Sequence, residues 1–200
     1  MNLPNKITLS RICLIPVFAA VFLLDCIPAN YFIAAIVFIV AACTDFVDGH
    51  IARSRGLVTN LGKFLDPIAD KVLVSTALIF LLVRQQTLTV LWDGAWVAVY
   101  AGICVAIILA RELIVSGFRM VAASTGLVLA ADKVGKVKTT FQDISIATLL
   151  AGADFFGIAL ASRIFNGIGI VALGIATVLT IWSGLGYIIK NRAVFKETKQ

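Results

Sequence analysis

The sequence predicts an all-α integral membrane protein, with six transmembrane helices in one domain over residues 1–200, around a polar cavity open to the cytoplasmic side. The first supporting observation is composition: 60% of the 200 residues are hydrophobic and 14% are charged, and the mean hydropathy is +1.02. A soluble domain carries about 25% charged residues. The second is length, because spans of roughly 20 residues fit this chain about six times. The third is a one-sided distribution of basic residues.

Six apolar segments account for the predicted spans. They cover residues 12–24, 31–44, 65–83, 96–110, 141–153 and 164–189. Several are too short to cross a bilayer unless the helix continues through a charged residue such as Arg11, Asp45 or Arg111. Ionisable residues inside membrane segments are costly and usually functional, so these extensions are candidate site positions. Pro67 cannot donate a backbone hydrogen bond, which predicts that the third helix begins near Asp66 or kinks there.

The basic residues predict the orientation. With six spans, one side of the membrane holds both termini and the connections after the second and fourth spans. Fifteen of the 17 Lys and Arg residues fall on that side, and Arg84 and Arg163 fall on the other. Cytoplasmic segments are enriched in Lys and Arg, so both termini and the site are predicted to face the cytoplasm from the cell membrane. The net charge of +6 does not indicate nucleic acid, because no recognition motif accompanies it.

Several conspicuous residues have structural explanations. The four cysteines are scattered in apolar runs without metal-binding or redox spacing, which predicts buried free thiols; they are Cys13, Cys26, Cys43 and Cys104. His50 occupies a position that predicts a surface or interface residue rather than a catalytic one. Trp92, Trp96 and Tyr100 lie near the outer end of the fourth span and are typical of an aromatic belt at the membrane interface.

Four aspartates are concentrated within residues 45–70. Asp45 and Asp48 are three residues apart, and Asp66 and Asp70 are four apart, so each pair lies on one face of a helix. Four clustered carboxylates repel one another unless cations neutralise them, and sets of oxygen ligands suit Mg²⁺ or Mn²⁺. Two such ions close together form the clamp used for in-line attack on phosphorus. The sequence therefore predicts a site for two divalent cations.

Small and basic residues accompany the aspartates. Gly49 and Ala52 leave room beside the first pair, and Gly62 lies on the side of Asp66 if the third helix begins early enough. A phosphate-bearing ligand can approach the backbone at such positions. Arg53 adds a forked, permanently charged donor that suits phosphate.

Together these residues form a pattern that resembles a known family. The pattern D-x2-D-G-x2-A-R-x8-G-x3-D-x3-D is met by Asp45, Asp48, Gly49, Ala52, Arg53, Gly62, Asp66 and Asp70. It is similar to the signature of the CDP-alcohol phosphatidyltransferases. The resemblance covers nearly the whole chain and implies a six-helix membrane enzyme that transfers a phosphatidyl-type group from a CDP-linked lipid to an alcohol and releases CMP.

The resemblance also implies roles for single residues. The four aspartates would ligate two Mg²⁺ or Mn²⁺ ions, and Asp70 would also take the proton of the acceptor hydroxyl. CDP-diacylglycerol would be contacted by Asn5, Thr8, Gly49, Ala52, Arg53, Thr59 and Gly62. Thr59 lies outside the strict pattern, and a surface threonine is the alternative. Asn5 and Thr8 share a helix face with Arg11 at three-residue spacing, for which an interfacial anchor is the alternative.

The acceptor is suggested by other segments. The start of the chain and residues 110–119 and 135–140 resemble family members that use glycerol 3-phosphate. An anionic acceptor needs a cationic pocket beside the metals, and the candidates are Arg111, Arg119, Lys136 and Lys138. Glu112 would orient one of these bases or accept a hydroxyl. For Arg111 the alternative is a side chain that snorkels to the interface.

Two classes of alternative stay open. Within the family, the acceptor could instead be serine, inositol phosphate or phosphatidylglycerol. A cation transporter also uses intramembrane aspartates, but it does not need the Gly-x2-Ala-Arg grouping, and a membrane scaffold needs none of the eight fixed positions. The expected partners are CDP-diacylglycerol, glycerol 3-phosphate, membrane lipids and, from the resemblance, a second copy in a homodimer.

Overall fold

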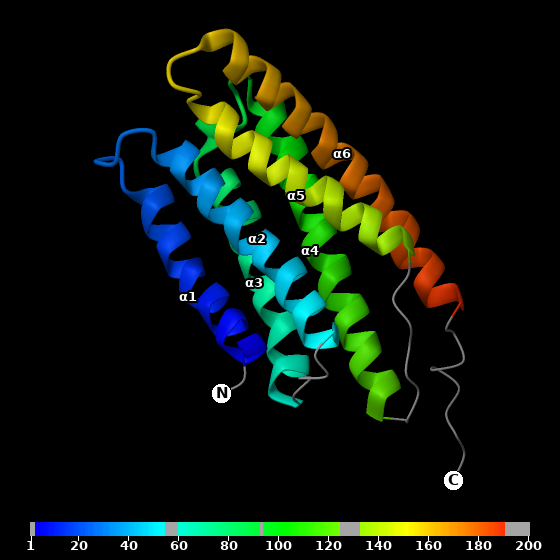
Figure 1. The fold of residues 1–200 in the computed structure, drawn as a ribbon. Helices are drawn as coiled ribbons and strands as arrows, with labels where there is room; N and C mark the ends of the chain where they lie inside the picture. Colours follow the sequence, from blue (N-terminus) through cyan, green and yellow to red (C-terminus); the bar gives the residue numbers. More distant parts are fainter. Residues whose placement is uncertain (1–2, 55–59, 93, 125–132, 191–200) are drawn as a thin grey trace.

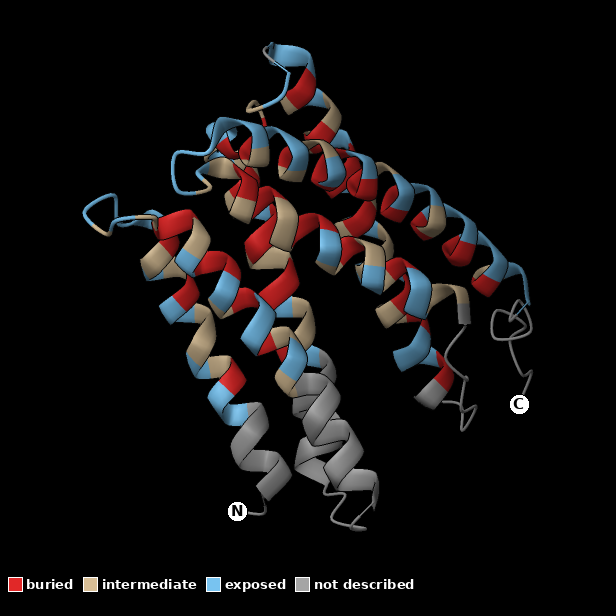
Figure 2. Cartoon of the chain, turned by 45° about the horizontal axis from the view of Figure 1, so that its top comes forward, coloured by how far each residue is buried: buried red, intermediate tan, exposed pale blue. Residues whose placement is uncertain are grey.

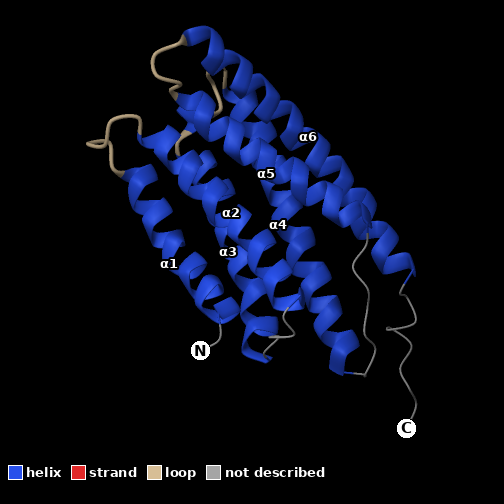
Figure 3. Ribbon diagram, in the orientation of Figure 1, coloured by secondary structure: helices blue, strands red, loops and turns tan. Residues whose placement is uncertain are grey.

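The computed structural model is a bundle of long helices. It describes the backbone of residues 3–54, 60–92, 94–124 and 133–190, and the side chains of residues 9–44, 68–92, 94–122 and 134–190. Within these ranges the chain is helical and contains no strand (Figures 1 and 3). The elements are α1 (Leu3–Leu23), α2 (Asn30–Ser54), α3 (Asn60–Val83), the short 3-10 helix η1 (Gln85–Thr87), α4 (Ala95–Ser124), α5 (Lys133–Ala153) and α6 (Ala159–Lys190). The prediction of an all-α chain is confirmed.

The six α-helices are long enough to cross a bilayer. They contain 21 to 32 residues, or about 31 to 48 Å at 1.5 Å per residue, against a hydrocarbon core of about 30 Å. As predicted, α1, α2 and α4 continue through Arg11, Asp45 and Arg111. By length and composition together, two of the described helices qualify as candidate spans, Ala95–Ala122 and Ala159–Lys190.

Of the two predicted possibilities for α3, a start near Asp66 is excluded, and a kink at Pro67 stays a prediction. The helix begins at Asn60, not near Asp66, so Pro67 lies inside it. An internal proline removes one backbone hydrogen bond, but membrane helices tolerate this because neighbouring helices and side chains satisfy the freed group. The early start places Gly62 and Asp66 one turn apart on the same face of the helix.

Buried side chains lie on the faces that the helices turn toward one another (Figure 2). Helix α1 packs on α2 and α3, whereas α5 packs on α2 and α6, and α4 packs on α6. In the core, the Phe80 ring stacks with those of Phe18 and Phe22 at centroid distances of 6.1 and 5.4 Å. Between α5 and α6, Ser145 Oγ donates a 2.8 Å hydrogen bond to the carbonyl of Gly169. Helix α5 therefore lies between α2 on one side and α6 on the other.

The outer faces of the helices are apolar. Leu113, Val178 and Trp182 are between 64% and 75% exposed, and an exposed apolar surface of this kind is typical of helices in contact with lipid. Three of the four free cysteines lie on the surface and only Cys104 is buried. The prediction of buried thiols is therefore wrong for Cys13, Cys26 and Cys43. Cys13 and Cys43 lie on helix faces that an apolar segment can turn toward lipid instead of a core, and Cys26 lies in the connection between α1 and α2.

The helices alternate in direction, so their ends form two groups (Figure 1). The aspartate end contains the starts of α1, α3 and α5 and the ends of α2, α4 and α6. The opposite end contains the connections at 24–29, 84–94 and 154–158. Of the basic residues, Arg84 lies just after α3 and Arg163 near the start of α6, both at the opposite end. The one-sided charge distribution therefore follows the course of the chain.

Candidate active site at the aspartate end

A wide cavity of about 250 Å³ lies at the aspartate end, between α3, α4, α5 and α6. It is lined by Asp70, Lys71, Arg111, Glu112, Arg119, Gly135, Lys136, Lys138, Thr139 and Tyr187. Five of these side chains are basic and two are acidic, so the lining has three positive charges in excess. A concave surface with this charge attracts anions and raises their local concentration. The cavity is therefore suited to a small, multiply charged anion.

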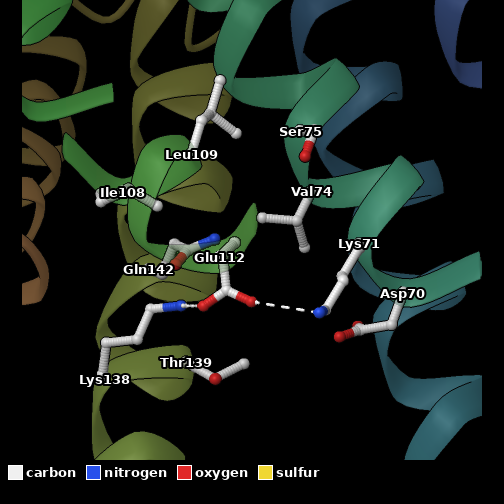
Figure 4. Close-up of a pocket in the computed structure, with 10 residues that line it drawn as sticks. All are labelled: Asp70, Lys71, Val74, Ser75, Ile108, Leu109, Glu112, Lys138, Thr139 and Gln142. Atoms are coloured by element: carbon white, nitrogen blue, oxygen red, sulfur yellow. Dashed lines mark hydrogen bonds and ion pairs between the residues drawn. The ribbon is translucent and has the colours of Figure 1, made fainter. Parts of the chain in front are cut away.

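A narrow cavity of about 40 Å³, whose lining residues are drawn in Figure 4, adjoins the wide one. The two cavities share Asp70, Lys71, Glu112, Lys138 and Thr139. The remaining residues of the narrow cavity are Val74, Ser75, Ile108, Leu109 and Gln142, which lie farther from the aspartate end on α3, α4 and α5. The site thus has a broad cationic part and a smaller inner part of mixed polarity.

Glu112 connects the basic residues of three helices. Its Oε1 accepts hydrogen bonds from Lys138 Nζ at 2.8 Å and from Arg111 Nη1 at 2.9 Å. Its Oε2 lies 3.8 Å from Lys71 Nζ, so the carboxylate stands between α3 and α5 (Figure 4). Only 4% of the Lys138 side chain is exposed, and a cation so deeply buried depends on its partner. One carboxylate cannot neutralise three cations, so positive charge is left over.

Arg111 points into the bundle. Its Nη2 donates a 3.1 Å hydrogen bond to Ser183 Oγ on α6, and 16% of its side chain is exposed. A Cβ at Gly184 would lie only 3.0 Å from Arg111 Cγ, so the glycine leaves room for the arginine against α6. These contacts, together with the ion pair to Glu112, favour a site residue over a side chain that snorkels to the interface.

Two further contacts position basic groups along the cavity. Arg119 Nε donates a 3.1 Å hydrogen bond to Tyr187 Oη, and the guanidinium carbon lies 5.2 Å from the centre of the Tyr187 ring. Phe118 packs edge-on against the same ring at 6.0 Å. On α3, Lys71 Nζ donates to Ser116 Oγ of α4. Tyr187 of α6 therefore positions Arg119 of α4, and Ser116 of α4 positions Lys71 of α3.

The chain matches the family described as CDP-alcohol phosphatidyltransferase over residues 1–182. It belongs to this family. Among similar proteins, one from Bacillus subtilis (strain 168) is 43% identical over 98% of this chain and 97% of its own length. One from Escherichia coli (strain K12) is 39% identical, over 96% of each chain. Both relatives are named CDP-diacylglycerol--glycerol-3-phosphate 3-phosphatidyltransferase.

Of the four aspartates predicted to bind metal, only Asp70 has a described side chain. Asp70 lines both cavities, whereas the side chains of Asp45, Asp48 and Asp66 lie outside the described residues. Within the described side chains, accordingly, no group of three acidic, histidine or cysteine ligands occurs. The backbone places one aspartate pair in the last half of α2 and the other in the first half of α3, so both pairs lie at the aspartate end. Carboxylate oxygens are ligands that Mg²⁺ and Mn²⁺ prefer.

The predicted donor-binding residues are placed by the backbone alone. The side chains of Asn5, Thr8, Gly49, Ala52, Arg53, Thr59 and Gly62 lie outside the described residues, and Thr59 lies outside the described backbone as well. The others belong to α1, α2 and α3 near the aspartate end. By contrast, the five predicted acceptor-binding residues are all described, and the wide cavity brings them together beside Asp70.

Sequence reasoning missed several residues of the site. Lys71 was assigned only to the general charge asymmetry, although it directly follows Asp70. Ser183 and Tyr187 lie four residues apart, on one face of α6, and the structure buries both. Polar groups that share a face of an apolar span are a recognisable signal of an interior site. Gln142 shares one face of α5 with Lys138 and Ser145, and all three are buried, so the same signal was present there.

Proposed function

We propose that this chain transfers the phosphatidyl group of CDP-diacylglycerol to glycerol 3-phosphate, giving phosphatidylglycerophosphate and CMP. The observation that carries this proposal is the cavity in which Asp70 stands beside five basic side chains. Glycerol 3-phosphate has a hydroxyl that can lose its proton to a carboxylate, and it has a phosphate whose negative charge can be bound by cations. Relatives that are 39% to 43% identical over nearly the full chain bear the name of this reaction.

The proposed chemistry is a direct displacement. The 1-hydroxyl of glycerol 3-phosphate attacks the lipid-side phosphorus of CDP-diacylglycerol, and Asp70 takes the hydroxyl proton. The bond from that phosphorus to the oxygen of CMP breaks, and CMP leaves with the bonding electrons. Two divalent cations held by Asp45, Asp48, Asp66 and Asp70 would neutralise the charge that develops on the phosphate oxygens. Positioning and charge neutralisation account for most of the catalysis, as in other phosphoryl transfers.

The basic residues hold the acceptor in this proposal. Arg111, Arg119, Lys136 and Lys138 bind the phosphate of glycerol 3-phosphate in the wide cavity through charge-assisted hydrogen bonds, which are stronger than neutral ones. Glu112 fixes the positions of Arg111 and Lys138 through its hydrogen bonds of 2.9 and 2.8 Å. The nucleotide and lipid of the donor are bound by Asn5, Thr8, Gly49, Ala52, Arg53, Thr59 and Gly62, on the side of the site that α1, α2 and α3 form.

The proposal includes an arrangement in the membrane. Six helices span the cell membrane, both termini and the active site face the cytoplasm, and two copies form a homodimer among the membrane lipids. The alternating helix directions support this arrangement, because they gather 11 of the 13 basic residues with a described backbone at the aspartate end. A tag placed within residues 84–91 should react only from outside the cell, and a reporter fused after Gln200 should stay inside. Cytoplasmic labelling of the tag would contradict the orientation.

An assay of CMP release tests the reaction. Purified protein with labelled CDP-diacylglycerol is given glycerol 3-phosphate, serine, inositol phosphate or phosphatidylglycerol in parallel, with and without a chelator. We expect CMP release with glycerol 3-phosphate, loss of activity on chelation, and recovery with Mg²⁺ or Mn²⁺. A preference for another acceptor would overturn the acceptor assignment but keep the transferase. Cation transport without any CMP release would overturn the transferase.

A further inference from the structure

Lys71 is an accessible cation beside the proposed base. It directly follows Asp70 on α3 and lines both cavities. Its side chain is 38% exposed, against 16% for Arg111 and 4% for Lys138. Figure 4 shows this side chain reaching from α3 toward α4, with its ammonium group pointing to Glu112. A ligand in the cavities can therefore reach the charged end of Lys71.

The contacts of Lys71 leave part of its binding capacity unused. An ammonium group has three hydrogens to donate, and among the described residues Lys71 Nζ donates one hydrogen bond, to Ser116 Oγ. Its distance of 3.8 Å from Glu112 Oε2 gives an ion pair that is too long for a hydrogen bond. The same carboxylate already accepts hydrogen bonds from Lys138 and Arg111 at 2.8 and 2.9 Å. Lys71 therefore keeps both charge and donors for a ligand.

The position of Lys71 limits which substrate it can bind. An ammonium group donates hydrogen bonds and accepts none, so it suits the anionic oxygens of a phosphate. The described residues that line the wide cavity all come from α3, α4, α5 and α6. Most of the proposed donor-binding residues instead belong to α1 and α2. The substrate within reach of Lys71 is accordingly the acceptor.

We infer that Lys71 binds the phosphate of glycerol 3-phosphate directly and exchanges its long ion pair with Glu112 for this contact. The inference rests on the proposed function and adds a fifth cation to the four basic residues named there. Because Lys71 and Asp70 are consecutive residues of one helix, α3 holds the phosphate contact and the base at a fixed separation. Such a pairing orients the acceptor so that its hydroxyl faces Asp70.

Propyl phosphate tests the phosphate contact apart from the chemistry, because it has the phosphate of the acceptor but no hydroxyl to react. Its inhibition constant against glycerol 3-phosphate is measured from CMP release, with CDP-diacylglycerol and Mg²⁺. We expect Lys71→Met to raise this constant by at least about tenfold, the effect of one charge-assisted hydrogen bond, and to change KM for CDP-diacylglycerol much less. Lys71→Arg keeps a charged donor and should retain most of the affinity.

A matched control is Lys190, the last residue of α6. It is exposed, lies at the same end of the bundle, and lines neither cavity. Lys190→Met removes the same charge and should leave the inhibition constant unchanged. An equal rise in both variants would mean a long-range effect of charge and would overturn the inference.

Two other results would also overturn it. If Lys71→Met lowers kcat but leaves the inhibition constant of propyl phosphate unchanged, Lys71 acts on Asp70 and not on the phosphate. If the affinity for CDP-diacylglycerol falls as much as that for propyl phosphate, Lys71 does not distinguish the acceptor from the donor.

A measurement on the wild-type protein decides the matter if Lys71→Met does not fold. Reductive methylation in detergent modifies accessible lysines, and mass spectrometry reports each modified position. We expect propyl phosphate to slow the modification of Lys71 but not that of Lys190. Equal modification of Lys71 with and without propyl phosphate would overturn the inference. No CMP release by the wild type from CDP-diacylglycerol and glycerol 3-phosphate would instead refute the proposed function.

Discussion

The two ends of the helix bundle differ in whether the chain balances its own charges. At the opposite end, Arg84 donates to Asp25 Oδ2 at 2.9 Å and to the carbonyl of Leu23 at 3.0 Å, so one cation meets one anion. At the aspartate end, Glu112 is shared by three cations, and the wide cavity has three positive charges in excess. Charge that the chain does not balance itself is left to be balanced by a ligand.

The buried amides show the same contrast. Asn166 is fully buried at the opposite end, where its Nδ2 donates to the carbonyl of Thr87 at 2.9 Å and its Oδ1 accepts from the Leu91 amide at 3.1 Å. Gln142 is buried nearly as deeply but leaves its Oε1 unpaired among the described residues. The satisfied amide of Asn166 holds the α3–α4 connection against α6, whereas at the aspartate end one amide oxygen has no such partner.

The difference between the two ends is tested most strongly by replacing one aspartate with asparagine at each end. Asp70→Asn removes the proposed base and one metal charge, so we expect kcat to fall by at least about 10²–10⁴-fold while the protein still folds. Asp25→Asn removes an exposed ion pair, so activity should change by less than about twofold, and stability by less than about 1 kcal/mol. CMP release and thermal unfolding measure both. Turnover above about a tenth of wild type for Asp70→Asn would contradict its role as the base.

The cations of the wide cavity should affect one substrate and not the other. Neutralising Arg119 or Lys136 removes a charge-assisted hydrogen bond to the phosphate of glycerol 3-phosphate, worth about 1.5–3 kcal/mol. We expect kcat/KM for glycerol 3-phosphate to fall by about 10- to 150-fold and the affinity for CDP-diacylglycerol to change much less. Arg163→Gln, an exposed arginine at the opposite end, is the matched control and should alter neither. Equal weakening toward donor and acceptor would show that these bases do not distinguish the two substrates.

The sequence predicted the fold and the polarity of the two ends because both follow from local properties. Apolar segments predict helices by composition, and basic residues near alternate helix ends predict which ends share a side. Continuation of α2 through Asp45 and of α4 through Arg111 was also predictable, because the apolar segments alone are too short to cross a membrane. The start of α3 was left open between Asp66 and an earlier residue, since neighbouring helices can accommodate Pro67 within a span.

The sequence predicted site residues only where the residue type itself is conspicuous. Basic residues in a mostly apolar chain are conspicuous, so Arg111 and Lys138 could be assigned to an anion pocket. Tyr187 and Ser183 act through contacts with arginines more than 60 residues away, and no local pattern reports such pairings.

Replacing Glu112, whose carboxylate is shared by three cations, tests whether it holds those cations in place. Glu112→Gln keeps the shape of the side chain but leaves Lys138 and Arg111 without their counter-charge, so their positions are no longer fixed. Because Lys138 is almost fully buried, we expect a stability loss of about 1–3 kcal/mol and a fall of about tenfold in kcat/KM for glycerol 3-phosphate. Glycerol 3-phosphate should raise the unfolding midpoint of the variant, because its phosphate supplies negative charge. An unchanged midpoint in the absence of ligand would show that Glu112 does not hold the cations in place.

The smallest effect on activity is expected at Asn166, although it is as buried as any residue of the site. Asn166→Ala leaves the carbonyl of Thr87 and the amide of Leu91 without the hydrogen bonds that join the α3–α4 connection to α6. Unpaired buried groups of this kind cost about 1–3 kcal/mol, so the unfolding midpoint should fall clearly. The kcat/KM for glycerol 3-phosphate should stay within about twofold of wild type, because Asn166 lines neither the wide nor the narrow cavity. If Asn166→Ala instead lowered activity at a temperature where it remains folded, the two ends would be coupled, and the division into a structural end and a ligand-binding end would be wrong.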